Sequence, residues 1–232
     1  MQATHLVIGL GEVGNSLRDV LQCDGFDNAK PCPSVNETYE FVHICFPYFD
    51  GFEDQVKNYQ QIFKPSVTVI HSTVPTGTSR ACGAIHSPIH GIHPNLSQAI
   101  KTFVKYIGAT ERKDAERLLE EYSRFGIHGL IVKNPETSEL SKLGCTTRHG
   151  LMLIEQKLFK KRCDEAGADF KEAYTMWNRF YGNGYEELGR PYIRRAIVED
   201  KPGKIGGHCI ISNCGLIGGA VADFILEQNE KL

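Results

Sequence analysis

The chain has 232 residues and a formal net charge of −2, and 41% of its residues are hydrophobic and 23% are charged. These values are typical of a soluble globular protein, and the near balance of charges gives no argument for binding nucleic acid or a membrane surface. No apolar run reaches the roughly 20 residues of a membrane span, and the first residues lack the basic and apolar regions of a signal peptide. We therefore expect a cytoplasmic protein.

Eight cysteines and nine histidines are spread along the chain. Without a secretory signal, the cysteines are expected to be reduced thiols rather than a disulfide framework. No two of them have the C-x-x-C spacing, which argues against a structural zinc site.

The first predicted strand, residues 5–10, runs directly into Gly9-Leu10-Gly11-Glu12-Val13-Gly14, and an amphipathic helix follows. A strand, a glycine-rich turn and a helix in this order form a dinucleotide-binding motif. In such a motif Gly9 makes the turn, Gly11 lets a pyrophosphate approach the backbone, and Gly14 lets helix and strand pack. The residues expected to contact NAD or NADP here are Gly9, Gly11, Glu12, Val13 and Gly14.

The segment after this helix, residues 23–35, is short and rich in Asp, Asn, Pro and Gly, so the second strand is expected to be shortened or missing. An acidic residue at the end of that strand normally holds the adenosine ribose. Asp24 and Asp27 are both available, and the pattern places neither of them clearly. The sequence therefore leaves the choice between NAD and NADP open.

Strands and helices alternate up to residue 133. Apolar runs predict strands at 39–47, 66–71, 84–90, 103–108 and 129–132, and helical periodicity predicts helices at 52–63 and 114–125. This alternation predicts an α/β fold, with a Rossmann-like, doubly wound, mostly parallel sheet in a dinucleotide-binding domain at residues 1–133. The loop at residues 72–78 follows the carboxyl end of a predicted strand, where open α/β sheets bind ligands.

Helical periodicity replaces this alternation after residue 133. Helices are expected at 136–166, 171–181 and 215–230, with breaks at Asn183-Gly184-Tyr185 and Gly189-Arg190-Pro191. The sequence therefore predicts a smaller all-α domain at residues 134–232.

The segment Pro202–Cys209 contains three glycines and a proline, which allow tight turns and a close approach to a ligand. It presents His208 and Cys209 side by side. A neighbouring imidazolium can lower the pKa of a thiol and favour the thiolate, so Cys209 is a candidate nucleophile. The alternative is a buried cysteine with a packing role.

Four histidines, His71, His86, His90 and His93, lie in one short region. Histidine combined with thiolate can bind zinc, iron or copper, but no carboxylate is interleaved and the spacing fits no standard motif. No metal is therefore expected. A histidine, with its ordinary pKa near neutrality, is better suited to act as a general base.

Five segments occur in a characteristic order. They are residues 9–14, Ile44-Cys45-Phe46-Pro47, Ser72-Thr73-Val74-Pro75-Thr76-Gly77-Thr78, Glu139-Leu140-Ser141-Lys142 and Pro202–Cys209. Together they resemble the UDP-glucose/GDP-mannose dehydrogenase family, within the 6-phosphogluconate dehydrogenase-like group. The resemblance covers residue 5 to about residue 210, and the Gly-Gly-His-Cys element is its most specific part.

The resemblance implies a two-step, NAD(P)-dependent oxidation of a sugar C6 alcohol to a carboxylate. Cys209 would attack the aldehyde, loss of a second hydride from the thiohemiacetal would give a thioester, and water would hydrolyse it. Lys142 would stabilise the oxyanion, and Thr73 would contact the nicotinamide region. The long helix from residue 136 resembles the dimerising helix of the family, so a homodimer is expected. The other cofactor-binding residues in the matched loops are Pro47, Ser72 and Pro75.

Several family positions differ in this chain. The asparagine expected one helical turn after the lysine is Thr146, and the family's Ser-Pro-Glu segment is Ser87-Pro88-Ile89-His90. The aspartate expected after the cysteine is replaced around Ser212-Asn213-Cys214. His90 is therefore the expected general base. No counterpart of the family's C-terminal sugar-nucleotide-binding domain is expected.

The sequence thus predicts an NAD(P)-dependent oxidoreductase that acts on an unknown small alcohol or aldehyde. Two other functions stay open. A non-catalytic dinucleotide-binding protein would bind a dinucleotide without turnover. An S-adenosylmethionine-dependent transferase would use the same glycine turn, and the weak second strand is compatible with it. The predicted catalytic residues are Cys209, Lys142, His208, Thr146 and His90.

Overall fold

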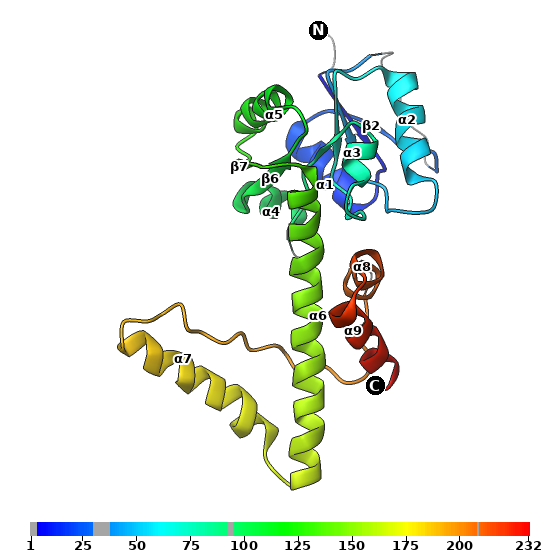
Figure 1. The fold of residues 1–232 in the computed structure, drawn as a ribbon. Coiled ribbons are helices and arrows are strands. Elements are labelled where there is room, and N and C mark those ends of the chain that lie inside the picture. The colour runs from blue at the N-terminus through cyan, green and yellow to red at the C-terminus, as the bar shows by residue number, and fades with distance from the viewer. Residues whose placement is uncertain (1–3, 30–37, 92–94, 208) are drawn as a thin grey trace. The chain divides into compact units, whose positions relative to one another are not determined.

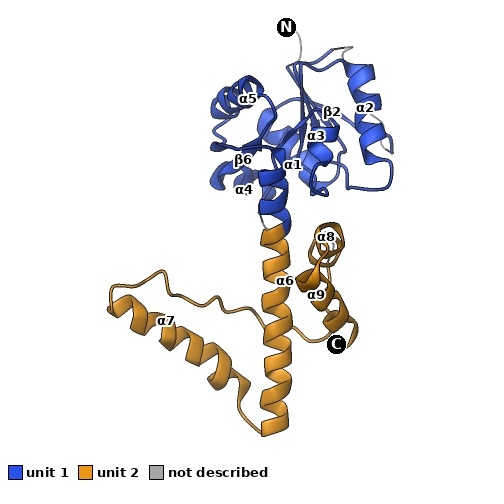
Figure 2. Ribbon diagram, viewed as in Figure 1, with its two compact units in different colours: residues 1–143 blue, residues 144–232 orange. Residues whose placement is uncertain are grey.

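A computed structural model describes residues 4–29, 38–91, 95–207 and 209–232 (Figure 1). The chain divides into two compact units, residues 1–143 (unit 1) and residues 144–232 (unit 2), shown in Figure 2. The division falls within the long helix α6, Pro135–Ala166. No helix in the described ranges has both the length and the apolar character that crossing a membrane requires.

A seven-stranded sheet forms the centre of unit 1 within its described residues, in the order β2-β1-β3-β4-β5-β6-β7. Neighbouring strands are parallel, except β5 and β6, which are antiparallel. The chain runs from β1 outward to β2 and then returns to β3, so a topological switch point lies between β1 and β3. The strands are β1 His5–Ile8, β2 Asp24–Phe26, β3 Phe41–Ile44, β4 Val67–Ile70, β5 Ile85–His86, β6 Lys105–Gly108 and β7 Gly129–Val132.

Helices of unit 1 cover both faces of this sheet (Figure 1). They are α1 Glu12–Leu21, α2 Phe52–Phe63, α3 Thr78–Ala81, α4 Leu96–Thr102 and α5 Arg112–Arg124. Alternate residues of a strand point to opposite faces, so Val7 packs in the core beneath α1, α4 and α5. Leu6 and Ile8 pack in the other core, against α2. The predicted α/β fold with a Rossmann-like, mostly parallel sheet is confirmed.

The second strand is shortened rather than missing. Residues Leu6–Ile8 of β1 pair with the three residues of β2. The sequence Asp24-Gly25-Phe26 has no strand pattern of its own, and it is held by this pairing and by the packing of the Phe26 ring on the rings of Tyr59 and Phe63. The short helices α3 and α4 were not expected either, because so few residues show no helical periodicity.

Unit 2 is helical throughout its regular described elements, so the predicted all-α character is confirmed. Besides its part of α6, it contains the π-helical turn Lys171–Met176, α7 Trp177–Glu187, α8 Ile210–Ile217 and α9 Ala220–Glu230. The break predicted at residues 183–185 is wrong, because α7 continues to Glu187. The chain turns instead at Gly189, whose φ is 73°.

The prediction of a single final helix at residues 215–230 is also wrong. Gly218 and Gly219 have φ values of 63° and 86° and separate α8 from α9, a backbone conformation that glycine adopts without steric cost. Both helices pack closely on α6 at Gly150, where a Cβ atom would lie 2.6 Å from the Ile210 side chain. The core of unit 2 consists of Ile154, Ile205, Cys214, Ala222 and Ile225.

Candidate functional site

Packing fixes two glycines of the glycine-rich turn. Gly9 has a φ of 93°, and its N–H donates to Phe26 O at 2.9 Å. A Cβ atom at Gly9 would lie 2.7 Å from the Phe46 nitrogen, and one at Gly14 would lie 1.8 Å from Gly9 O. Both positions therefore require glycine because the chain itself occupies the space.

Gly11 has a different reason to be glycine. A Cβ atom there would meet no described atom within 4 Å, and Gly11 is the N-cap of α1, with no side-chain capping bond among the described residues. The first-turn N–H groups of such a helix attract phosphate. The described chain therefore leaves position 11 unobstructed at the N-terminus of α1, where the motif predicts a pyrophosphate.

An acidic residue stands next to this turn. Asp27 directly follows β2, and its Oδ2 accepts the Leu10 N–H at 2.7 Å while its Oδ1 accepts the Ala29 N–H at 2.9 Å. Asp24 is engaged elsewhere, since its Oδ2 accepts the Tyr39 hydroxyl at 2.8 Å. Asp27 thus occupies the position of a ribose-binding carboxylate, a choice between two residues that the sequence alone did not make.

The loops after β3 and β4 lie beside the glycine-rich turn. Parallel pairing places the carboxyl ends of β1, β3 and β4 at one sheet edge. The Ser72 hydroxyl donates to Phe46 O at 2.6 Å, which joins the loop that contains Pro47 to the loop that contains Thr73 and Pro75. The predicted cofactor-binding residues of unit 1 therefore come together at this edge.

The first turns of α6 are fastened to the same region of unit 1. The buried Glu139 carboxylate accepts the N–H groups of Gly77 at 2.6 Å and Ser79 at 2.8 Å. His86 Nε2 donates to Ser72 O at 3.2 Å, so its Nδ1 accepts the Ser138 hydroxyl at 2.9 Å. Burial lowers the pKa of His86 to about 3. Glu139 of the matched motif thus anchors the β4 loop, a role that sequence reasoning missed.

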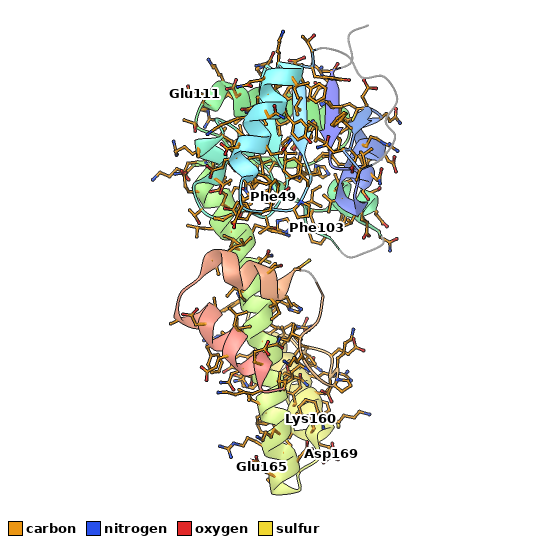
Figure 3. The ribbon with its side chains drawn as sticks, turned by 90° about the vertical axis from the view of Figure 1, so that its right-hand side faces the viewer. Phe49, Phe103, Glu111, Lys160, Glu165 and Asp169 are labelled. Carbon is orange, nitrogen blue, oxygen red and sulfur yellow. The ribbon has the colours of Figure 1, made fainter. Side chains whose placement is uncertain are left out.

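Lys142 and His90 lie close to each other in unit 1. The Lys142 ammonium donates to Ile89 O at 2.8 Å, next to His90. Burial, with added repulsion from Lys142 and Lys105, lowers the pKa of His90 to about 4. The ring is therefore neutral at neutral pH and a weaker base than an ordinary histidine. Phe103, labelled in Figure 3, places its ring centroid 6.3 Å from that of His90.

The other histidines of the region do not form a metal site in the part of the chain that is described. No group of three or more His, Cys, Asp or Glu residues there could hold a metal ion. His71 bonds to other buried groups of unit 1, and His93 lies outside the described residues.

In unit 2, Cys209 is exposed and forms the N-cap of α8, while its predicted neighbour His208 lies outside the described residues. Thr146 Oγ1 accepts the buried Asn213 side-chain amide at 3.2 Å. Asn213, which belongs to the segment where the family's aspartate is replaced, thus places a side-chain amide beside Thr146.

Comparison with known proteins supports the family suggested by the motifs. No family model matches the chain. The chain is 24% identical over 196 residues to a UDP-N-acetyl-D-mannosamine dehydrogenase of Methanococcus vannielii, a match that covers 81% of this chain and 39% of the relative. A second relative of that description, from Methanococcus maripaludis, is 24% identical over 153 residues, 62% of this chain and 33% of the relative.

Solved structures agree on the fold. A UDP-D-ManNAc dehydrogenase from Pyrococcus horikoshii has a TM-score of 0.79 at 15% identity, over 98% of this chain and 68% of the other. A UDP-glucose dehydrogenase from Pyrobaculum islandicum has a TM-score of 0.73 at 18% identity, over 100% and 68%. A Mycobacterium tuberculosis 3-hydroxyisobutyrate dehydrogenase has a TM-score of 0.72 at 13% identity, over 100% and 94%.

The chain is a distant relative of the UDP-sugar dehydrogenases. The resemblance expected from its five motifs is confirmed. The chain spans between a third and two fifths of the length of the curated relatives that it matches. The roles of its individual residues, from Gly11 to Cys209, stay predictions.

Proposed function

We infer that the protein is an NAD-dependent oxidoreductase whose cofactor binds at the carboxyl edge of β1, β3 and β4. The observation that carries this proposal is the open N-terminus of α1 at Gly11 beside the Asp27 carboxylate. The first-turn amides of α1 hold the pyrophosphate, and Asp27 accepts hydrogen bonds from the ribose hydroxyls. A 2′-phosphate would face the Asp27 carboxylate, so NAD is preferred over NADP.

When bound, the nicotinamide accepts hydride from the substrate. Thr73 lies in the loop after β4, which the hydrogen bond from the Ser72 hydroxyl to Phe46 O holds in place. In this proposal Thr73 would contact the nicotinamide region. The Lys142 ammonium, held at Ile89 O, stabilises negative charge on the substrate oxygen. The neutral ring of His90 is able to accept a proton, although its lowered pKa makes it a weak base.

Cys209 is the proposed nucleophile. Its thiolate would form a C–S bond with an aldehyde, transfer of hydride from the thiohemiacetal to NAD+ would give a thioester, and water would cleave the C–S bond to give a carboxylate and the free thiol. Thr146 and Asn213 form a polar pair in the same unit as Cys209. The substrate class that the relatives' names suggest is a UDP-linked sugar.

The homodimer expected from the long helix is part of this proposal. Trp177 and Phe180 of unit 2 are 64% and 61% exposed, and large aromatic side chains of this kind are enriched at protein interfaces. Sedimentation analysis tests it: the wild type should be a dimer, and a monomer at micromolar concentration would refute this part.

Calorimetric titration with NAD+ and NADP+ tests the cofactor proposal. The wild type should bind NAD+ more tightly, and Asp27→Asn should reduce the ratio of the two affinities about tenfold, because one charged hydrogen bond contributes about 1.4 kcal/mol. Asp54→Asn, which removes an exposed acid from α2, is the matched control. An unchanged ratio in Asp27→Asn would refute the role of Asp27.

A measurement of turnover distinguishes the proposed oxidoreductase from a second candidate function. The lowered pKa of His90 and the bond of Lys142 to Ile89 O favour a second candidate, a dinucleotide-binding protein without catalysis. NADH formation with UDP-sugars that is lost in Cys209→Ser supports the oxidoreductase. NAD+ binding with no turnover on any sugar alcohol or aldehyde supports the binding protein.

A further inference from the structure

Three buried imidazoles form a diagonal row across the sheet of unit 1. His5 belongs to β1, His43 to β3, and His71 directly follows β4. His43 pairs with Val7 in register and with Val69 on its other side, so each histidine lies two residues further along its strand than the one before. A two-residue offset keeps the side chains on one face and makes them diagonal neighbours.

Hydrogen bonds connect this histidine row without interruption. His5 Nδ1 lies 3.0 Å from His43 Nε2, and His43 Nδ1 lies 2.9 Å from His71 Nε2. The ring centroids are 5.2 Å apart at both steps. All three residues are at most 3% exposed, so the described protein, rather than solvent, supplies the partners of the row.

The outer end of the row reaches the surface through α5. His5 Nε2 lies 3.0 Å from Glu121 Oε1, and Glu121 Oε2 accepts Arg124 Nη1 at 2.8 Å. The Arg124 side chain is 61% exposed. Glu121 is therefore the point where the row meets groups in contact with water.

The inner end of the row reaches a buried amine. His71 Nδ1 lies 2.7 Å from Ser87 O and 3.4 Å from Lys105 Nζ. Lys105 Nζ also donates to Ser87 O at 2.9 Å and to Pro88 O at 3.0 Å. Lys105 is only 1% exposed, and its amine lies beneath the loop that continues to Ile89 and His90.

Two proton arrangements are consistent with the bonds between Glu121, the three rings and Lys105, and they differ in whether His71 Nδ1 donates to Ser87 O. In the first, each ring carries its proton on Nδ1, so His5 Nε2 must accept from a protonated Glu121. Lys105 is then a neutral amine, with two N–H groups for the two carbonyl oxygens. In the second, each ring carries its proton on Nε2 and Glu121 is ionised. The Lys105 ammonium then has three N–H groups for Ser87 O, Pro88 O and His71 Nδ1. In this arrangement Ser87 O accepts from Lys105 alone, because His71 Nδ1 has no proton to donate.

The surroundings disfavour a positive charge on the rings of the row. Burial lowers the pKa of His43 and His71 well below the ordinary value. It also lowers the pKa of His5, against the opposing effect of Glu121. Burial lowers the pKa of Lys105 to about 7, so both forms of this amine are accessible near neutral pH.

Other titratable and charged groups face the row from the packed elements. Burial raises the pKa of Cys45 to about 12 and also raises that of Tyr122, so both are uncharged at neutral pH. The charges that act on the two ends are those of Glu40, Glu121, Arg124 and Lys142, and His86 is a further neutral neighbour of His71.

We propose that His5, His43 and His71 relay a proton between the Glu121 carboxyl, which bonds to the exposed Arg124, and the buried amine of Lys105. The Glu121 O–H proton moves to His5 Nε2, each ring passes its Nδ1 proton to the next group, and His71 gives its Nδ1 proton to Lys105 Nζ. Glutamic acid and amine become glutamate and ammonium, and each ring changes tautomer, so protons and charge balance.

The relay changes the charge of Lys105, whose amine lies beneath the loop that contains Ile89 and His90. Lys105 acts electrostatically on both Lys142 and His90, so protonation of Lys105 disfavours a positive charge on either of them. This inference concerns unit 1 alone and goes beyond the proposed function, since the relay needs neither cofactor nor turnover.

Nitrogen NMR of the protein labelled with ¹⁵N-histidine and ¹⁵N-lysine tests the relay without any substitution. Protonated and unprotonated ring nitrogens have distinct chemical shifts. The three rings should show the same tautomer, or the same mixture of the two, at each pH and should change in step with Lys105 Nζ. Rings with different tautomers would break the bond sequence and overturn the proposal.

A double-mutant cycle distinguishes a relay through the rings from a direct electrostatic effect of Glu121 on Lys105. Glu121→Gln should lower the midpoint of the Lys105 titration by about one pH unit, because it removes the anion that accompanies the ammonium. In the His43→Phe background the same change should shift nothing. An equal shift in both backgrounds would overturn the relay, and if His43→Phe does not fold, the wild-type tautomers decide.

Glu120→Gln is the matched control for this cycle. Glu120 bonds to Arg124 Nη2 at 2.7 Å, as Glu121 bonds to Nη1, but its side chain is 71% exposed. This variant removes the same charge one residue away and should leave the ring tautomers and the Lys105 midpoint unchanged. A shift as large as that of Glu121→Gln would count against the relay.

Discussion

Glu139 Oε1 accepts the backbone N–H of Ser79 at 2.8 Å, across sixty residues of sequence. The second oxygen accepts the N–H of Gly77 at 2.6 Å, so one buried carboxylate holds the start of α3 and the loop before it. The motif Glu139-Leu140-Ser141-Lys142 thus combines an anchor with a candidate catalytic lysine, three residues apart on one helix face.

Replacing this anchor should destabilise the protein. Glu139→Ala leaves the buried N–H of Ser79 and the partly buried N–H of Gly77 without their acceptor, so the free energy of unfolding should fall by about 3 kcal/mol, as measured by urea denaturation. Glu136→Ala is the matched control, because it removes only the partially exposed ion pair with Arg80 and should cost about 1 kcal/mol or less. Equal losses in the two variants would contradict the anchoring role.

Two glycines of the cofactor turn should respond differently to alanine. Gly14→Ala forces a Cβ atom against Gly9 O and should lower the free energy of unfolding by about 3 kcal/mol or more. Gly11→Ala places its Cβ in open space and should change stability by about 1 kcal/mol at most, while weakening NAD+ binding. Thermal unfolding and calorimetric titration measure the two effects. NAD+ affinity unchanged in Gly11→Ala would contradict the pyrophosphate site.

The buried His86 should make stability depend on pH. Its pKa is lowered from 6.5 to about 3 in the folded protein, so between these values the unfolded chain binds a proton that the folded chain does not. Its contribution to stability is therefore complete above pH 6.5 and is lost as the pH falls towards 3, at about 1.4 kcal/mol per pH unit.

Replacing His86 should flatten this dependence. Between pH 6 and 4, His86→Gln should reduce the slope of unfolding free energy against pH by about that amount. Ser138→Ala, which removes the hydroxyl bonded to Nδ1 but keeps the imidazole, should lower stability and keep most of the slope. A slope unaltered by His86→Gln would show that the ring is not buried in its neutral form.

Thiol labelling tests the proposed nucleophile. Cys209 and Cys145 are both exposed, so accessibility alone predicts similar rates of reaction with iodoacetamide. If Cys209 is the nucleophile, it should react at least about tenfold faster than Cys145 at neutral pH, as followed by peptide mass spectrometry. Cys214, which is fully buried, should react slowest. Equal rates at Cys209 and Cys145 would refute an activated thiol.

Local pattern was sufficient for much of this protein. Apolar runs bounded by turns located most strands of the sheet, and the helix at 52–63 was predicted with its observed ends. The glycine-rich turn predicted where a dinucleotide would bind, because the spacing of Gly9, Gly11 and Gly14 expresses a local backbone geometry. Errors arose where an element is short, as at β2, or where two glycines interrupt an apolar helical run, as at Gly218 and Gly219.

The candidate site divides in the same way. The sequence by itself predicted the resemblance to UDP-sugar dehydrogenases, the fold class and the opening segment Gly9–Gly14, since these depend on residues close together in the chain. Only the tertiary structure decided that Asp27 rather than Asp24 stands at the turn and that Asn213 supplies the amide near Thr146. These contacts join residues far apart in sequence, and no local pattern encodes them.

The Cys209 segment remained the strongest evidence of ancestry in the sequence, while the histidine row was invisible there. His5, His43 and His71 each stand alone beside or within an apolar strand, and each by itself is an ordinary buried histidine. The parallel pairing of β1, β3 and β4, with a two-residue offset at each step, brings them into one hydrogen-bonded line. Strand register is set by the packing of the whole sheet, which is why the row exists only in the folded protein.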